Sequence, residues 1–356
     1  MRSSSKQIDM TKGPIIKLVV LFALPICLGN ILQQLYSTVD TLIIGNFCGS
    51  VSLAAVGTSS QPVEMLLCIF LGIGTGVSIL VSQYFGSNDA DKLKSTVATS
   101  VSFLYMCAVP VSVLGLFIGP LILKFMQVPE ETFTYATYYI DIIFLSTLGN
   151  MGYNMNAGIL RGLGDSTASL LFLFISCFVN IILDLVFVAG FRMDVPGAAL
   201  ATAIAMFVSW FFSIAYIKKK YPELEFTILP HHVDFGILKE VISVGLPLGL
   251  NNSLYSIGHI IIQSLINAQG STFIAACTVG GKINGLANVA ITSFSSAATT
   301  YAGQNLGAKN YKRLKNGGLR IPIFSGIVTA IAGITMTFFC RPVLALFTND
   351  EAVLRL

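Results

Sequence analysis

Long apolar runs alternate with short charged segments along the whole sequence, and this alternation restricts the fold more than any other feature. A helix needs about 20 mostly apolar residues to cross a lipid bilayer. Nine runs have this character: 15–45, 52–83, 95–124, 132–160, 166–190, 196–217, 236–268, 273–305 and 317–347. Only 11% of the 356 residues are charged, against about 25% in soluble domains. The sequence therefore predicts an all-α polytopic membrane protein.

Lysine and arginine are distributed unequally between the two alternating sets of loops. The set that includes the N-terminus holds most of them, including Lys218, Lys219 and Lys220. The other set holds Lys124, Arg192, Arg341 and Arg355. Because basic loops stay on the cytoplasmic side of the membrane, we expect the N-terminus to be cytoplasmic.

The sequence also repeats itself at a nearly constant offset of 221–222 residues. The matching segments are 21–30 with 241–251, 53–57 with 274–278, 82–94 with 303–315, and 120–131 with 341–352. Six runs precede the second copy, so both copies enter the membrane from the same side. The pattern predicts a two-lobe bundle of parallel six-helix repeats, related by an axis along the membrane normal.

The repeat suggests three parts of the chain. An N-lobe with six transmembrane helices covers residues 1–217, a cytoplasmic linker covers 218–235, and a partial C-lobe with three transmembrane helices covers 236–356. Only three of the six runs expected in the second copy are present. We expect a C-terminally truncated product, with a natural short form as the alternative.

The run at 170–190 carries two polar residues, Asn180 and Asp184. They are four residues apart and therefore lie on one face of a helix. A charged residue at the centre of a bilayer costs about 2.5–3.5 kcal/mol on insertion scales, so it normally faces a protein interior or a water-filled cavity and has a function there. The alternative is a protonated carboxyl group that only hydrogen-bonds a neighbouring helix.

Polar residues of other runs fall at a similar depth. With a rise of 1.5 Å per residue, four of them lie roughly 7–11 Å below the outer surface: Asp40, Tyr139, Asp184 and Thr202. Asn180 lies one turn deeper, and Asp141 slightly below Tyr139. Oxygen ligands suit a hard cation, so we predict a buried site for H⁺ or Na⁺ around Asp40, Asn180, Asp184 and Thr202. The alternative is that these helices face different ways and each polar residue has its own partner.

Like Asp141, two further charged residues within runs are candidates for a central cavity. Glu64 follows Pro62 and either contacts cation or substrate or caps a kinked turn. Lys282 faces the cavity or extends to the membrane surface. Between Val241 and Asn349 the second copy has no Asp or Glu, so any titration within the membrane should occur in the first copy.

Several other functions are not indicated. The seven cysteines stand singly, which does not indicate a disulfide framework or a zinc site. No set of nucleophile and base suggests an enzyme, and the lysines at 218–220 indicate a membrane-side interface and not nucleic-acid binding. The glycines at 72, 74 and 76 predict close helix packing, because a nucleotide-binding loop would need a following lysine. We expect no cofactor beyond a transported ion.

On these residues the chain resembles the multidrug and toxic compound extrusion (MATE) family. The matching stretches are LPICLGNILQQLYSTVDTLIIG at 24–45, LAAVGTSSQPVEMLL at 53–67, VSQYFGSNDADKLK at 81–94, AGILRGLGDS at 157–166, NIILDLVFV at 180–188, VPGAALATAIA at 195–205 and AGQNLGAKN at 302–310. The resemblance implies two six-helix lobes that exchange H⁺ or Na⁺ for cationic, amphipathic drugs. It also implies cation coupling at Asp40, Asn180, Asp184 and Thr202, with Tyr36 and Tyr139 beside cavity-lining aromatic residues.

Two departures from the family pattern refine this interpretation. Many relatives carry an acid in the seventh span, where residues 243–268 have none, and this favours the DNA-damage-inducible (DinF-like) bacterial branch. Lys282-Ile283-Asn284 replaces a common Arg-Ile-Glu triplet. We expect a monomer in the bacterial inner membrane, in contact with lipid and drugs.

Two alternatives to efflux stay open at this point. One is a flippase for lipid-linked precursors or polysaccharides, which would need a more cationic cavity than Lys282 alone supplies. The other is a truncated membrane protein that does not transport.

Overall fold

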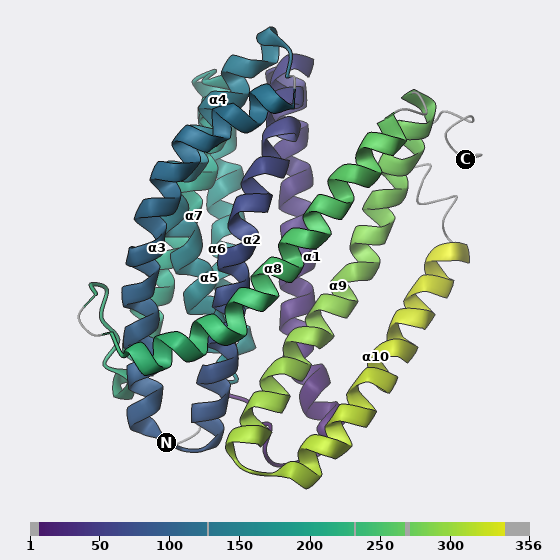
Figure 1. Ribbon diagram of the computed structural model, residues 1–356. Helices are drawn as coiled ribbons and strands as arrows, with labels where there is room; N and C mark the ends of the chain where they lie inside the picture. Colours follow the sequence, from purple (N-terminus) through teal and green to yellow (C-terminus); the bar gives the residue numbers. More distant parts are fainter. Residues whose placement is uncertain (1–6, 127, 231–232, 268–270, 339–356) are drawn as a thin grey trace.

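The computed structural model describes residues 7–126, 128–230, 233–267 and 271–338, and this part of the chain is helical throughout, without strands (Figure 1). The α-helices are α1 (Ile15–Phe47), α2 (Ser50–Gly86), α3 (Ala90–Phe125), α4 (Glu130–Leu145), α5 (Thr147–Gly162), α6 (Ser166–Asp184), α7 (Asp194–Lys220), α8 (Phe235–Asn267), α9 (Ser271–Gly307) and α10 (Tyr311–Phe338). Two short elements complete the list: the π-helical η1 (Leu185–Gly190) and the 3-10 turn η2 (Pro222–Leu224).

The predicted all-α membrane fold is confirmed. In the described part, five helices are long and apolar enough to cross a membrane: Ile15–Phe47, Ala90–Phe125, Ser166–Gly190, Asp194–Lys220 and Tyr311–Thr335. Large apolar side chains also cover the outer surface of the bundle, as with Phe117, which is 72% exposed, and Phe178, which is 60% exposed. Such a surface suits lipid tails. The predicted run at 317–347 extends beyond the described residues, which end at Phe338.

The predicted run at 132–160 forms two helices, α4 and α5, that meet at Ser146. The Ser146 hydroxyl donates a hydrogen bond to the Ile143 carbonyl at 2.8 Å, and the Thr147 hydroxyl donates one to the Phe144 carbonyl at 2.7 Å. Serine and threonine hydroxyls that bond nearby carbonyls compete with the regular helical hydrogen bonds. Two such residues in succession therefore account for the break.

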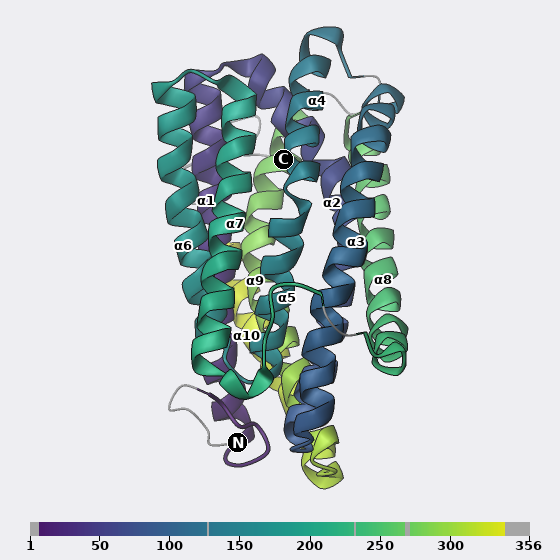
Figure 2. The same ribbon diagram turned by 90° about the vertical axis from the view of Figure 1, so that its left-hand side faces the viewer.

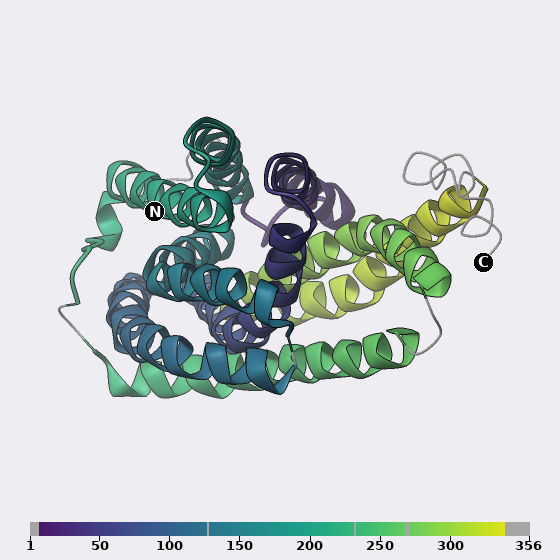
Figure 3. The same ribbon diagram turned by 90° about the horizontal axis from the view of Figure 1, so that it is seen from above.

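The helices form two groups. Helices α1–α7 stand nearly side by side, and α8–α10 are inclined against them (Figure 1). Helix α6 packs between α1 and α7 on one side of the first group, and α3 contacts α8 on the other side (Figure 2). Seen from above, α8 runs along α2 and α3 and so joins the two groups (Figure 3). We call the end of the bundle that holds loops 87–89, 163–165, 221–230 and 308–310 the basic end.

Glycines allow the two groups to approach closely. A Cβ atom on Gly76 of α2 would lie 2.8 Å from the Gly245 Cα atom of α8, and a Cβ atom on Gly72 would clash with Gly249. Small residues at a helix interface let the backbones approach in this way. The predicted packing role of the glycines at 72 and 76 is thus confirmed.

A second close contact joins the ends of α2 and α9 at the basic end. A Cβ atom on Gly86 would clash with the backbone of Gln304, and a Cβ atom on Gly307 would clash with the backbone of Gln83. In the sequence repeat, Gly86 aligns with Gly307 and Gln83 with Gln304. A reciprocal contact of this kind is what a two-fold relation between the copies produces.

Candidate functional site

Polar side chains from three helices meet inside the first group. Asn180 and Asp184 lie one turn apart at the end of α6, and both are buried. The Asn180 amide donates a hydrogen bond to the Thr202 hydroxyl of α7 at 3.3 Å. The carboxyl group of Asp40, on α1, lies next to that of Asp184. The structure therefore brings together the four residues of the predicted cation site.

Local structure explains this convergence. Helix α6 packs against α1 at Gly29, where an added Cβ atom would lie 3.2 Å from the Leu173 side chain. The short distance between the two helix axes lets Asp40 reach the face of α6 that carries Asp184. Directly after Asp184 the α-helix changes to the π-helical turn η1, and such turns occur frequently at functional sites.

Apart from a hydrogen bond that the two carboxyl groups can share when one of them is protonated, most oxygens of this site have no donor among the described residues. In the described part, neither oxygen of Asp184, nor Oδ1 of Asp40, nor Oδ1 of Asn180 accepts a hydrogen bond. An unpaired buried acceptor typically costs about 1–3 kcal/mol, and more when it is charged. Two adjacent carboxylates would also repel each other. Neutralisation by a proton, or by a cation that these oxygens coordinate, would relieve both costs.

The same part of the chain has no cluster of three or more His, Cys, Asp or Glu side chains. A bound metal ion would therefore use two carboxylates with the Asn180 and Thr202 oxygens. Carboxylate, amide and hydroxyl oxygens suit a hard cation better than a soft transition metal.

A cavity of about 510 Å³ extends through the first group of helices, and Asp40 and Asp184 are not among its lining residues. Tyr36 precedes Asp40 by one turn of α1, and Tyr36 and Tyr139 both line the cavity. Further lining residues are Asn30, Gln33, Ser60, Glu64, Leu67, Asn150, Asn154, Arg161 and Met206. The mixture of amide, aromatic, apolar and charged groups suits an amphipathic molecule, and the volume suits a drug-sized one.

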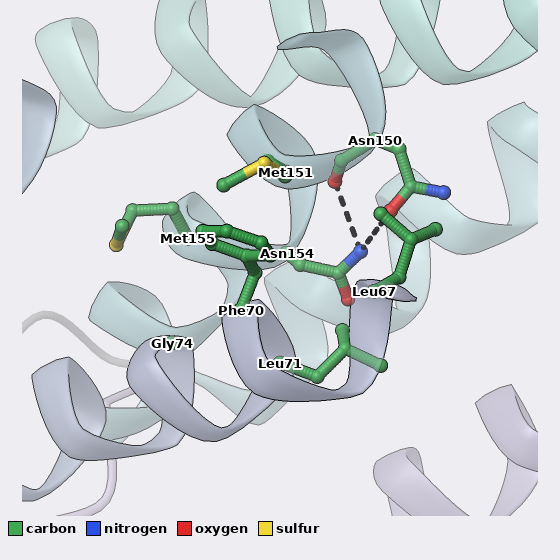
Figure 4. Close-up of a pocket in the computed structure, with 8 residues that line it drawn as sticks. All are labelled: Leu67, Phe70, Leu71, Gly74, Asn150, Met151, Asn154 and Met155. Carbon is green, nitrogen blue, oxygen red and sulfur yellow. Dashed lines mark hydrogen bonds between the residues drawn. The ribbon is translucent and has the colours of Figure 1, made fainter. Parts of the chain in front are cut away.

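Helices α2 and α5 form the wall of this cavity at a small neighbouring pocket (Figure 4). The Asn154 amide donates to the Asn150 carbonyl at 2.9 Å and to the Asn150 side-chain oxygen at 3.0 Å. Leu67, Leu71, Asn150 and Asn154 belong to both spaces. The pocket holds about 10 Å³, close to the minimum for a single water molecule.

The remaining predicted site residues differ in whether they line this cavity. Glu64 is exposed on α2 and lines the cavity with Tyr36 and Tyr139. Asp141 is half-buried on α4 and is not among the lining residues of this cavity, so its cavity role stays a prediction. The side chain of Lys282 lies outside the described ones.

The charge count of the sequence missed one lining residue. The predicted run at 132–160 ends just before Arg161 and so places it in a loop, but it lies in the last turn of α5 and its side chain lines the cavity. Helical spacing offered a signal, because Asn150, Asn154 and Arg161 are related by intervals of four and seven residues and so share one face.

Comparisons with known proteins agree with the family resemblance that the sequence showed. A family model described as MatE matches residues 25–186 and 247–356. The probable multidrug resistance protein YpnP of Bacillus subtilis is 29% identical over 310 residues, which is 87% of this chain and 69% of the relative. The probable multidrug resistance protein NorM of Thermotoga maritima is 24% identical over 348 residues, covering 96% and 74% of the two chains.

Solved structures share the fold. A crystal structure of MATE in complex with MaL6 superposes with a TM-score of 0.90 at 25% identity, over 98% of this chain and 78% of the other. An outward-facing multidrug resistance MATE family transporter of the MOP superfamily superposes with a TM-score of 0.91 at 24% identity, over 99% and 79%.

Proposed function

The chain belongs to the MatE family of multidrug transporters, which are not enzymes, and we propose that it is a secondary active antiporter. In this proposal it exports cationic, amphipathic compounds in exchange for H⁺ or Na⁺. The observation that carries the proposal is the adjacent carboxyl pair of Asp40 and Asp184, in which both Asp184 oxygens and Oδ1 of Asp40 are buried and receive no donor from another described residue. The pair lies next to a drug-sized cavity.

The carboxyl pair is the proposed coupling site. Coulomb repulsion between two charges grows as the surrounding dielectric falls, so the ion-free pair favours separation of α1 from α6. Binding of H⁺ or Na⁺ removes that repulsion. For Na⁺, the oxygens of Asn180 and Thr202 complete the set of ligands. A ligand shifts a conformational equilibrium only by its difference in affinity for the two states, and this pair supplies such a difference.

Helix α1 is the proposed link between the ion and the substrate. Tyr36 and Asp40 occupy one face of α1, and Tyr36 belongs to the cavity wall. A shift of α1 that follows ion binding therefore changes the shape of the cavity. Glu64 supplies a negative charge for a cationic substrate, and the tyrosines supply aromatic faces, to which cations are attracted.

We further propose a location in the bacterial inner membrane, with the basic end in the cytoplasm, in accord with the distribution of Lys and Arg. At this end Met10 donates its backbone amide to the Gln304 side chain at 2.8 Å, and Gln304 donates to the Gly162 carbonyl at 3.3 Å. These bonds tie α9 to the first group of helices. The proposed cytoplasmic side is thus closed in this conformation.

The flippase alternative receives less support. It requires a cavity dominated by positive charge for anionic head groups, but the lining contains both Arg161 and Glu64. We therefore retain drug efflux as the proposed function.

The test is transport in liposomes that contain the full chain. A fluorescent cationic drug is followed while a Na⁺ gradient and a pH gradient are imposed separately, which identifies the driving ion. Asp40→Asn and Asp184→Asn should each abolish gradient-driven transport. Glu131→Gln, which changes an exposed carboxyl group at the start of α4, is the control. Transport that survives both Asp substitutions unchanged would refute this mechanism.

A further inference from the structure

Arg161 introduces a positive charge into a cavity that is otherwise suited to cations. It lies in the last turn of α5, toward the basic end, and shares a helix face with Asn150 and Asn154. Asn150 is eleven residues before it on α5, about 16 Å at the helical rise per residue. Helix α6 begins at the basic end and carries Asp184 at its opposite end, so the guanidinium group is remote from the carboxyl pair.

This guanidinium group has no counter-ion among the described residues. The ion pairs in that part of the chain join Lys94 to Glu225 and Lys220 to Asp165. The nearest carboxylate along the sequence, Asp165, also accepts hydrogen bonds from Tyr216 and Tyr221, each at 2.9 Å. The hydrogen bond that Arg161 accepts, from Thr300, goes to its backbone carbonyl. A charge withdrawn from bulk water without a partner is unfavourable, so the group requires water or a ligand.

Two amide side chains of the cavity lining already donate hydrogen bonds within the protein. Asn30 donates to Thr292 and Ser293 at 3.3 Å each. Asn154 donates to Asn150. Arginine carries five N–H donors in a planar fork, so among the described lining residues Arg161 is the positively charged donor available to an anionic group.

We infer that Arg161 forms a carboxylate-binding subsite, so that the cavity selects amphiphiles that carry a carboxylate as well as a cationic group. The carboxylate pairs with the guanidinium fork, a geometry that permits two parallel hydrogen bonds. The cationic part of the same molecule lies toward Glu64, on the α2 wall. This inference rests on the proposed export function and narrows its substrate class.

The test uses two dyes that differ in one group. Rhodamine 110 carries a carboxylate, and rhodamine 123 is its methyl ester and carries only the positive charge. Binding to the purified full chain in nanodiscs is measured by fluorescence anisotropy. We expect Arg161→Gln to weaken rhodamine 110 binding at least about tenfold, the scale of a lost charge-assisted pair. Rhodamine 123 binding should stay unchanged or become tighter, because a like charge has been removed.

Two further variants make the result decisive. Arg161→Lys keeps the charge without the fork and should lose only part of the rhodamine 110 affinity. Lys94→Gln removes an exposed cation of the basic end that is not in the cavity, and should change neither dye. Retained rhodamine 123 binding also shows that each variant is folded. Equal weakening of both dyes by Arg161→Gln, or no change in either, would overturn the inference.

The two proposals fail in different ways. If the wild-type protein exports rhodamine 123 with an ion gradient but Arg161→Gln affects both dyes equally, antiport stands and the subsite is refuted. If the wild-type protein transports neither dye under any gradient, the export function fails and the subsite inference fails with it.

Discussion

The two copies of the repeat share their packing but differ in their chemistry. At the contact between α2 and α9, Gly86 and Gly307 occupy equivalent positions and meet equivalent glutamines. Inside the membrane the equivalence ends. With an offset of 222, Asp40 of α1 corresponds to Ile262 of α8, which is 55% exposed. With the offset of 221 that relates 53–57 to 274–278, Glu64 of α2 corresponds to Gly285 of α9.

This difference shows which features a repeat must keep. Close helix contacts need small residues in both copies, because each copy supplies half of a reciprocal interface. A carboxylate within the membrane is costly, so one set of acids that binds one ion is sufficient. The two copies therefore share their close helix contacts, and we place the ion site in the first copy alone.

The largest expected effect is the loss of ion-driven transport when an acid of the first copy is replaced. Asp184→Asn should reduce ion-driven efflux to background, a loss of at least about a hundredfold if neutralisation of the pair supplies most of the coupling energy. Efflux from liposomes under Na⁺ and pH gradients measures it. The double variant Asp40→Asn with Ile262→Asp should stay inactive. Restored transport would show that the second copy can hold the site and would break the comparison.

The next largest effect is a loss of stability when the helix contact shared by the two copies is disturbed. Gly86→Val and Gly307→Val each force a side chain into the reciprocal contact, and overpacking of this kind costs about 1–3 kcal/mol. The two variants should lower the Tm by similar amounts in thermal unfolding of the purified protein. Gly318→Val is the control, because a Cβ atom there meets nothing within 4 Å. A large effect at only one of the two positions would contradict the two-fold relation.

A smaller effect should separate the two equivalent glutamines. The Gln304 side chain bonds Met10 and Gly162, whereas Gln83 makes no such bond within the described part. Gln304→Ala leaves the buried Met10 amide unpaired and should lower the free energy of unfolding by about 1–3 kcal/mol. Gln83→Ala should have almost no effect. Denaturant unfolding of both variants measures the difference, and equal losses would show that side-chain chemistry is also repeated here.

The smallest effect concerns the segment that joins the copies. Lys94 donates a hydrogen bond to Glu225 and lowers the pKa of that carboxyl group below its usual value of 4.5. A lowered pKa in the folded state stabilises the protein above the unfolded-state pKa, and this contribution disappears as the pH falls through the folded-state pKa. Because Glu225 is exposed, Glu225→Gln should change the Tm only slightly at pH 7 and not at all near pH 3. A clear difference at both pH values would assign Glu225 another role.

Sequence patterns predicted much of this fold because the bilayer permits few solutions. Apolar runs of this length must satisfy their backbone hydrogen bonds internally, so they form helices. The spacing of Asn180 and Asp184, and the depth of Asp40 and Thr202, follow from helix geometry alone. That these four side chains meet could only be predicted as one of two alternatives, since depth does not define which way a helix face points.

Other features depended on local competition or on neighbouring helices. The break between α4 and α5 arises from hydroxyl groups of Ser146 and Thr147 that bond nearby carbonyls. A prediction based on apolar runs does not include such bonds. Arg161 could not be separated from a loop cation, because one more helical turn decides whether it lies in the cavity. Asp141 lies at the depth of the site but is not part of this cavity wall. The rotation of α4 about its axis determines which of its side chains face the cavity, and packing against neighbouring helices sets that rotation.

By itself, the sequence determined the helical class, the positions of the apolar runs, the repeat and the absence of Asp and Glu between residues 241 and 349. These properties follow from composition and spacing, because each depends on residues close together in the chain. Tertiary structure alone decided that Asp40 lies next to Asp184 and that Arg161 faces the cavity. Both depend on how helices distant in sequence rotate and approach one another, and the packing of glycines and large side chains between them decides that.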